Sequence, residues 1–467
     1  MQIPILNGIF TDNEPSLKVS YPVNLAPVVQ SSGVSEGYLK PGDGIVLSGT
    51  STGNCRGGIL WNNVLYRVMG SKLVYIDANG ASTTLGDVGN NNRQVTMDYS
   101  FDRLMIASNK KLFYWDGTTL AEVTDPDLGV VLDVKWVDGY TMTTDGSFLV
   151  VADLNDPTNV NPLKYGSSEI DPDPVKALLK LRNEINALNR YTIEAFTNVG
   201  GEYFPFQRIK GAQIQKGVVG THACCVYLET IAFVGSGRNE QPSIYMAQNG
   251  QTSRISTQSI DAILENYTEA QLSEVKVEAR NDRESVLLYV HLPDRTLVYD
   301  GNVSQATGQQ TWFVLSSGIN TLSQYRAINF VYAYNTWTCG DPTSSNVGYL
   351  SDTVGSHWGE TVTWEFGTKI TYNASRGAIF SELELVALTG RIEQGKNPMI
   401  STSYSIDGMV WSQDRNIRVG GIGERMKRLL WFRQGMMRSM RMQRFRGDST
   451  AHVSFLRLEA QIEPLFA

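Results

Sequence analysis

The sequence is 467 residues long, and its 42% hydrophobic and 19% charged residues are typical of a folded chain rather than a disordered one. Its longest apolar runs fall far short of the roughly 18 residues that a membrane-spanning helix needs, and the start of the chain lacks the basic region of a secretion signal. We therefore expect two or more domains, no membrane insertion, and synthesis and use in the cytosol.

The N-terminal segment, residues 1–56, is rich in proline, glycine and serine, which favours an extended arm. It ends in a short apolar run, Gly44–Ser48, that is typical of a strand. Such a strand could pair with the last sheet of a ring and close it. We therefore predict an arm followed by a closing strand over residues 1–56.

Residues 57–360 repeat a loose unit of short strands and turns. The clearest copies cover 65–88, 103–123 and 286–302, and each has an apolar strand, a turn, a strand ending in an aromatic residue, and an Asp-Gly or Asn-Gly hairpin signal. The copies begin roughly 36 to 57 residues apart, close to the length of a four-stranded propeller blade. This spacing predicts a β-propeller of six or seven blades.

Two segments depart from the strand pattern. Residues 173–188 carry apolar side chains at helical spacing, and Asp173 precedes Pro174 as an N-cap precedes the first helical residue, so we predict an inserted helix in the fourth blade. Thr268 and Gln271 have the spacing of a capping box, which predicts a short helix after the apolar residues near Ile260. This second segment is either a rigid connector between blades or a presented binding loop.

The repeat stops near residue 360. Six alternating segments follow at the spacing of a β-sandwich, with glycine-rich and asparagine-rich turns between them. We therefore predict an all-β chain: an N-terminal arm with its closing strand (1–56), a propeller (57–360), and a C-terminal sandwich (361–467), with one or two short inserted helices.

The sandwich contains a basic segment. Between Arg415 and Arg446 ten basic residues face one acidic residue, a net charge of +9, which leaves −16 for the rest of a chain whose total is −7. Nine of the ten are arginine, which favours planar contacts with carboxylates or phosphates over a merely solvated face. Direct contact with DNA and a solvated sheet face are the alternatives. The candidate residues for a partner or subunit interface are Arg425, Arg428, Arg433, Arg438, Arg441, Arg444 and Arg446.

The sequence predicts no catalytic, metal or cofactor site. Gly49–Gly53 has G-x-S-x-G spacing, but the residues after it are poor helix formers, so Ser51 is expected in a polar loop. His222 lies near Cys224 and Cys225, which is more typical of a buried strand than of a thiol–histidine pair. Ser405–Trp411 is similar to the structural hairpin of sialidases. We therefore expect a protein that is not an enzyme.

A family resemblance adds to these patterns. The segments KGVVGTH (216–222), PSIYMAQNGQTSRIST (242–257), LLYVHLPDRTLVYD (287–300) and YRAINFVYAYNTWTCGD (325–341), in this order, resemble the packaged DNA stabilization protein family, which forms the tail hub or nozzle of short-tailed bacteriophages. The basic C-terminal segment is similar to the ending of that family. The helical pattern at 173–190 departs from it.

The resemblance implies a structural role in the virion. The protein would form a hexameric ring in the phage tail, below the portal and its adaptor (the head-to-tail connector) ring, and would contact the tail needle or tip protein and the tailspikes or fibres. It would retain packaged DNA and form the ejection channel, so double-stranded DNA would pass it transiently. Assembly would take place in the host cytoplasm.

The alternative function is a carbohydrate-binding or carbohydrate-cleaving β-propeller, either receptor-binding or sialidase-like. Its tyrosines and tryptophans could form a sugar-binding surface, and cleavage would need paired carboxylates at the mouth of the propeller. The sequence does not place such a pair.

Overall fold

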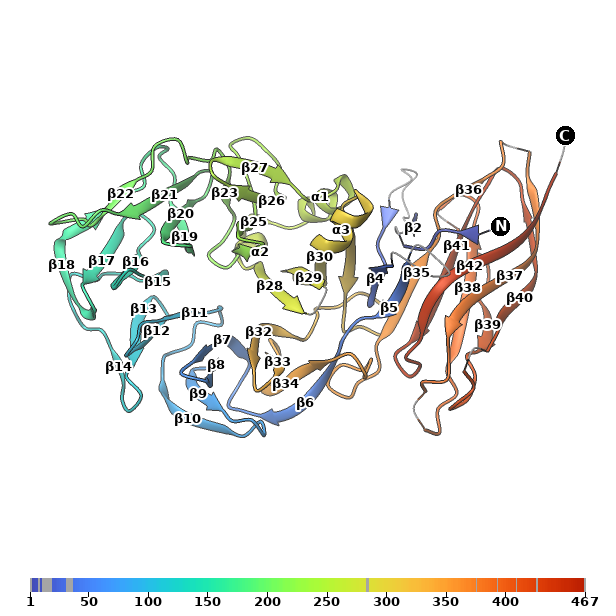
Figure 1. The fold of residues 1–467 in the computed structure, drawn as a ribbon, viewed down its shortest axis with the longest axis horizontal. Helices are drawn as coiled ribbons and strands as arrows, with labels where there is room; N and C mark the ends of the chain where they lie inside the picture. The colour runs from blue at the N-terminus through green and yellow to red at the C-terminus, as the bar shows by residue number, and fades with distance from the viewer. Residues whose placement is uncertain are drawn as a thin grey trace.

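The computed structural model describes residues 2–6, 9–10, 19–30, 37–282, 285–374, 376–392, 394–408, 410–425 and 427–465. In this part of the chain, seven sheets of four or five strands form a ring, and two further sheets form a sandwich beside it (Figure 1). The fold is therefore an all-β propeller followed by a C-terminal β-sandwich, as the sequence predicts.

Each blade is an antiparallel sheet, numbered here in chain order. Blades one to four consist of β7 (Cys55–Trp61), β8 (Val64–Met69), β9 (Lys72–Ile76), β10 (Ser82–Asp87); β11 (Thr96–Tyr99), β12 (Leu104–Ser108), β13 (Lys111–Trp115), β14 (Leu120–Glu122); β15 (Asp133–Val137), β16 (Tyr140–Thr144), β17 (Leu149–Asp153), β18 (Asp156–Gly166); and β19 (Val175–Leu181), β20 (Glu184–Asn189), β21 (Ile193–Asn198), β22 (Phe206–Arg208). Blades five to seven consist of β23 (Gly217–Val218), β24 (Cys224–Tyr227), β25 (Thr230–Ser236), β26 (Ser243–Gln248), β27 (Gln251–Arg254); β28 (Lys276–Asp282), β29 (Ser285–His291), β30 (Thr296–Asp300), β31 (Trp312–Leu315); and β32 (Ile328–Ala333), β33 (Thr336–Gly340), β34 (Asn346–Ser351) with β6 (Gly44–Thr50).

The sandwich draws strands from both ends of the chain. Its first sheet has the order β4 (Leu25–Val29), β5 (Gly37–Pro41), β42 (Ser454–Pro464), β37 (Ala378–Leu388), β40 (Leu429–Met437), with β1 (Gln2–Ile3) also on β42. The second has the order β35 (Thr363–Gly367), β41 (Met440–Asp448), β38 (Met399–Ser405), β39 (Arg415–Arg418), with β36 (Thr371–Tyr372) also on β41. A separate pair is formed by β2 (Ile9–Phe10) and β3 (Val19–Ser20).

The ring is closed by a strand from the start of the chain. β6 pairs antiparallel with β34, with Val46 opposite Tyr349, so blade seven combines the two ends of the propeller sequence. The turn after β32 adds a second link, because the Tyr334 hydroxyl donates to the carbonyl of Ile76 at 2.8 Å in blade one. Pairing across the closure removes a free sheet edge.

Carboxylates join the inner strands of neighbouring blades. Asp98 of blade two accepts a hydrogen bond from the backbone N–H of Trp136 in blade three, and Asp133 of blade three accepts one from the N–H of Leu178 in blade four, both at 2.8 Å. The inner strand of each blade is an edge strand, and these bonds satisfy N–H groups there.

The predicted helix at 173–188 is wrong. The segment is a hairpin of β19 and β20, turning at Arg182, whose φ is 55°. Asp173 does not cap a helix but accepts hydrogen bonds from the N–H of Tyr191 at 2.6 Å and the hydroxyl of Thr192 at 3.2 Å. Because an inner strand packs between two blades, β19 buries residues of both faces, and its apolar run mimics helical spacing.

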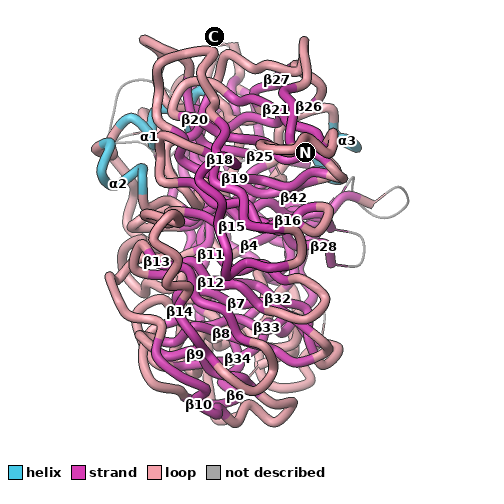
Figure 2. Tube along the Cα trace, turned by 90° about the vertical axis from the view of Figure 1, so that its left-hand side faces the viewer, coloured by secondary structure: helices cyan, strands magenta, loops and turns pink. Residues whose placement is uncertain are grey.

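Three short helices occur in the described residues: α1 (Gln258–Glu265), α2 (Glu269–Ser273) and α3 (Gly301–Thr307). The predicted capping box of Thr268 and Gln271 is present at the start of α2. Figure 2 shows α1 and α2 on one face of the propeller and α3 on the opposite face. In the same residues, no helix is long and apolar enough to span a membrane.

The hairpin signals were only partly correct. Asn79-Gly80 and Asp116-Gly117 lie in the tight connections between β9 and β10 and between β13 and β14. Asp300-Gly301 does not form a hairpin: the Asp300 carboxylate accepts hydrogen bonds from the N–H groups of Asn302 and Val303 at 3.0 and 3.1 Å and caps α3. An Asp-Gly pair occurs both in hairpin turns and at helix starts, because in both the aspartate carboxylate accepts hydrogen bonds from the backbone N–H groups that follow it.

Candidate functional site

Arg441, one of the seven candidate interface arginines, lies inside the sandwich. It is 1% exposed, and its guanidinium lies between the rings of Tyr404 and Phe380, 3.9 and 4.4 Å from their centroids. It donates to the carbonyl of Gln434 at 2.7 Å and to the side chain of Gln443. Burial lowers the pKa of Arg441 to about 10. This arginine holds the two sheets together and is not available to a partner.

Three other candidates are engaged within the chain. Arg428 donates to Glu384 on β37 at 2.7 Å, and Arg446 forms an ion pair with Asp414. Arg444 stacks on Trp411, 4.1 Å from the ring centroid. These side chains remain partly or fully accessible, but a partner would have to compete with their present contacts.

The remaining three candidates, Arg425, Arg433 and Arg438, are exposed, and within the described residues no side-chain partner is seen for them. Arg433 lies on β40, Arg438 in the turn after it, and Arg425 in the loop before it. The three arginines therefore lie before, on and after the single strand β40. β40 is the last strand of its sheet, so it forms an open sheet edge.

Apolar side chains accompany these arginines, and the sequence reasoning missed them. Phe432 and Met436 on β40 are 55% and 49% exposed, and Ile379, which faces Met436 on β37, is 39% exposed. We call Phe432, Met436, Ile379, Arg433 and Arg438 the β40 surface. Exposed apolar residues beside arginines are the composition of many protein–protein contacts. Inward and outward side chains alternate along a strand. Applying that alternation to β40, with its bulge taken into account, could have identified these exposed residues.

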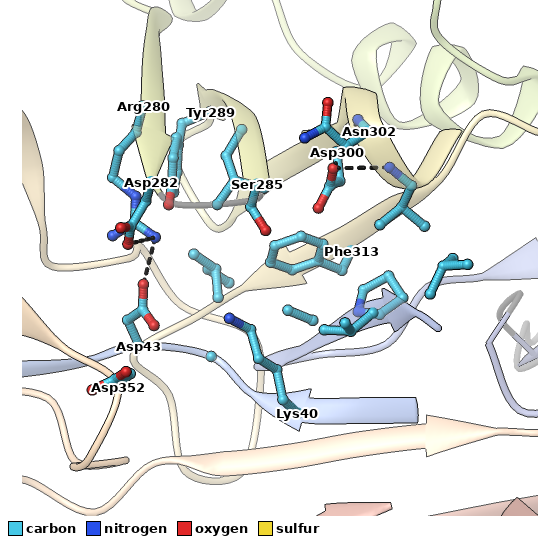
Figure 3. Close-up of a pocket in the computed structure, with 18 of the residues that line it drawn as sticks. Lys40, Asp43, Arg280, Asp282, Ser285, Tyr289, Asp300, Asn302, Phe313 and Asp352 are labelled. Carbon is cyan, nitrogen blue, oxygen red and sulfur yellow. Dashed lines mark hydrogen bonds and ion pairs between the residues drawn. The ribbon is translucent and has the colours of Figure 1, made fainter. Parts of the chain in front are cut away.

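A second feature is a cavity of about 550 Å³ between the sandwich and blade six. Figure 3 shows Arg280 and Asp43 at one end, Asp300 at the other, and Lys40 extending toward Phe313 between them. Arg280 forms an ion pair with Asp43 and lies 3.8 Å from Asp282. Burial alone would lower the pKa of Arg280, but Tyr289 and the two carboxylates raise it, so the cation is firmly held at the junction of the domains.

A polar network joins the inner strands of blades six, seven and one near the centre of the propeller. The Gln94 side chain accepts from the Asn329 amide at 3.1 Å and donates to the carbonyl of Cys55 at 3.4 Å, which links blades one and seven. Lys276 contacts Asn329, and Glu278 accepts from the Asn329 N–H at 2.9 Å. A chamber of about 400 Å³ lies against this network on the face of α2, large enough for a small molecule but not for a duplex.

His222 and Cys224, which are close in the sequence, are half-buried side chains of blade five. Burial and the positive charges of Lys276 and Lys135 lower the pKa of His222 to about 3, and burial raises the pKa of Cys224 to about 12. A neutral imidazole beside a protonated thiol is the reverse of an activated pair. Ser51 shares a 2.6 Å hydrogen bond with Ser82, in a polar loop.

The hairpin at Ser405–Trp411 is structural. Ser405 accepts from the N–H of Gly408 at 2.9 Å and donates to Asp407 at 2.9 Å, and Asp407 accepts from the N–H of Val410 at 2.9 Å. Trp411 bridges back to Ser405. The motif therefore closes a turn and presents an indole to Arg444, with no role in sugar chemistry required.

Comparison with known proteins matches both domains. The family model described as Bacteriophage P22 Gp10, beta-propeller, matches residues 1–355, and the model described as Bacteriophage P22 Gp10, beta-sandwich, matches residues 363–463. The tail hub protein gp10 of Salmonella phage P22 is 28% identical over 463 residues, with 94% of each chain covered.

Two solved structures are much less similar to this chain in sequence than the phage P22 protein is. The N-terminal domain of Nup159 has a TM-score of 0.43 and 9% identity, covering 71% of this chain and 99% of that one. PorZ of Porphyromonas gingivalis has a TM-score of 0.40 and 11% identity, covering 65% of this chain and 37% of that one. At such scores neither structure carries an argument.

Proposed function

Because this chain belongs to the bacteriophage P22 Gp10 family, we propose that it is the tail hub protein of a short-tailed phage and that its copies form a ring in the tail. The observation that carries the proposal is the match of both domains, in order, over nearly the whole chain. The role is structural and involves no catalysis. The hexameric state and the position below the portal-adaptor ring are part of the proposal.

In this proposal DNA passes between copies and not through a propeller. Gln94, Lys276 and Asn329 lie near the centre of each propeller, so an ejection channel requires a space enclosed by several chains. The net charge of −16 outside the basic segment supports it, because an acidic wall binds phosphate weakly and lets packaged DNA leave. Retention of DNA before ejection would then depend on the closed tail tip.

We assign the contact between copies, or with the adaptor ring, to the β40 surface. Its apolar residues would supply the buried area of the contact, and its arginines would set the orientation of the partner. A head-to-tail contact between two different surfaces of neighbouring copies can close into a ring. Arg425 and Arg428 would lie at its margin. Arg444 and Arg446 lie on β41 of the other sheet and are left out of it, as is the buried Arg441. The needle or tip protein and the tailspikes or fibres are the further proposed partners, with assembly in the host cytoplasm.

The test is a double charge reversal, Arg433→Glu with Arg438→Glu. Light-scattering mass measurement, with and without the adaptor protein, should show rings for the natural chain and monomers for the variant. The matched control is Arg182→Glu, an exposed arginine at the tip of blade four, which should assemble normally. Rings of unchanged size and stability in the double variant would exclude the β40 surface, and a chain that stays monomeric with every tail protein would exclude the hub role.

The carbohydrate alternative is not favoured by the family match. Glycan binding by the isolated protein would reopen it.

A further inference from the structure

The segment from Tyr21 to Ile45 runs between the two domains and contributes to both. β4 and β5 belong to the first sheet of the sandwich, with Leu39 opposite Phe455 of β42. Only Gly42 and Asp43 separate the end of β5 from β6, the closing strand of the propeller. We call residues 21–30 and 37–45 the strap. The rest of the propeller sequence separates it from sandwich strands β35 to β42.

The strap is part of two hydrophobic cores. Leu25 and Leu39 are fully buried in the sandwich core. Ala26 and Ile45 are buried in a different cluster, formed by side chains of blades six and seven. Removing the strap would therefore expose apolar surface on both domains at once, and neither core is complete without it.

Asn24 makes the tightest connection. Its side-chain amide donates to the carbonyl of Ser316, after the last strand of blade six, at 2.8 Å and to the carbonyl of Thr363 in the sandwich at 2.7 Å. Its side-chain oxygen accepts from the N–H of Ser316 at 2.9 Å. The residue is 7% exposed and has a φ of 53°, a conformation that asparagine tolerates better than most residues. One carboxamide thus binds both domains.

Backbone hydrogen bonds continue the connection on either side of Asn24. The N–H of Val23 donates to Glu365 of β35 at 2.8 Å, while the N–H of Val314 in β31 donates to Pro22 at 2.8 Å. The strap therefore lies between an outer strand of the propeller and the first strand of the second sandwich sheet. At its other end, Asp43 forms the buried ion pair with Arg280 of β28.

We propose that the strap couples the propeller and the sandwich into one cooperative body, so that the sandwich neither folds nor moves as an independent module. The three side-chain hydrogen bonds of Asn24 and the Asp43–Arg280 ion pair fix the angle between the domains beside the junction cavity. A load on the β40 surface is then passed to the propeller through the strap.

The test uses the full chain and amide hydrogen exchange. Asn24→Gly keeps the backbone conformation and removes the carboxamide, and it should raise exchange in β42 and β37 at least tenfold while β16 in blade three stays unchanged. The matched control is Asn329→Gly, which removes another buried asparagine with positive φ, 5% exposed, within the propeller. Because the two domains of the natural chain unfold together, this control should raise exchange in β42, β37 and β16 by the same factor, whereas Asn24→Gly raises it in β42 and β37 alone.

Calorimetry supplies the second measurement. The natural chain should unfold in one transition that includes both domains, and Asn24→Gly should split off a sandwich transition at lower temperature. Asp43→Asn is the milder variant if Asn24→Gly does not fold, and it should split the transition in the same direction. Two separate transitions in the natural chain, or unchanged β42 exchange in both variants, would overturn the inference.

Discussion

At the scale of single residues, arginines of the same basic segment have different structural roles. Arg438 and Arg441 are three positions apart in one basic segment, yet one is exposed at a turn and the other is buried between two aromatic rings. The difference arises because the turn between β40 and β41 sets which side chains face the core.

This difference predicts unequal effects on stability. Arg441→Ala should lower the free energy of unfolding by about 3 kcal/mol, because it leaves the carbonyl of Gln434 without its donor and opens a gap between the rings. Arg438→Ala should change it by less than about 0.5 kcal/mol. Urea titrations of both variants measure the two values, and equal losses would contradict the assigned roles.

The lowered pKa of Glu278 leads us to expect that the stability of the fold depends on pH. Burial alone would raise its pKa, but Lys276, His291 and the hydrogen bond from Asn329 lower it to about 2. A carboxyl group with a lowered pKa stabilises the fold above its unfolded pKa, and this stabilisation is lost as the pH falls from about 4.5 toward 2.

The natural chain should therefore lose stability through this window, by about 3 kcal/mol from Glu278 alone. Glu278→Gln should be less stable at pH 7 and should show a flatter acid limb. Unfolding curves measured at several pH values test this. A variant whose acid limb keeps the natural slope would show that other carboxylates cause the loss.

At the scale of elements, ring closure relies on more than strand pairing. β6 completes blade seven, and the hydroxyl of Tyr334 bonds to blade one on the opposite side of the same closure. The sequence indicated the closing strand, but Tyr334 lies in a turn with a φ of 54°, where no pattern marks a tyrosine as structural.

Tyr334→Phe should lower the free energy of unfolding by about 1 to 2 kcal/mol. The ring is retained, but the hydroxyl's bond to the Ile76 carbonyl and the bond that it accepts from the Leu65 N–H are lost. Tyr332→Phe is the control, because Tyr332 is 52% exposed on β32 and should have no effect. Chemical denaturation of both variants gives the comparison. A loss of equal size in the control would indicate a general effect of removing a hydroxyl near the ring mouth.

At the scale of the whole molecule, the domain division at 1–56, 57–360 and 361–467 remains a proposal that the strap complicates. The first of these segments supplies strands to both of the others, so a boundary drawn along the sequence does not separate two cores. If the protein acts as the proposed tail hub, this coupling would hold the β40 surface at a fixed position relative to the propeller during DNA ejection.

The all-β class, the repeating blades, the six main strands of the sandwich and the capping box of α2 could be predicted from the amino-acid sequence, because they depend on patterns within short windows. The prediction failed at 173–188, where an inner strand buried on both faces loses its alternation. Only the tertiary structure decided which arginines are exposed, where Asn24 binds, and that the N-terminal strands enter the sandwich. The exposure of each arginine depends on how the two sheets pack, and the other two features depend on contacts between residues hundreds of positions apart. Local periodicity encodes neither.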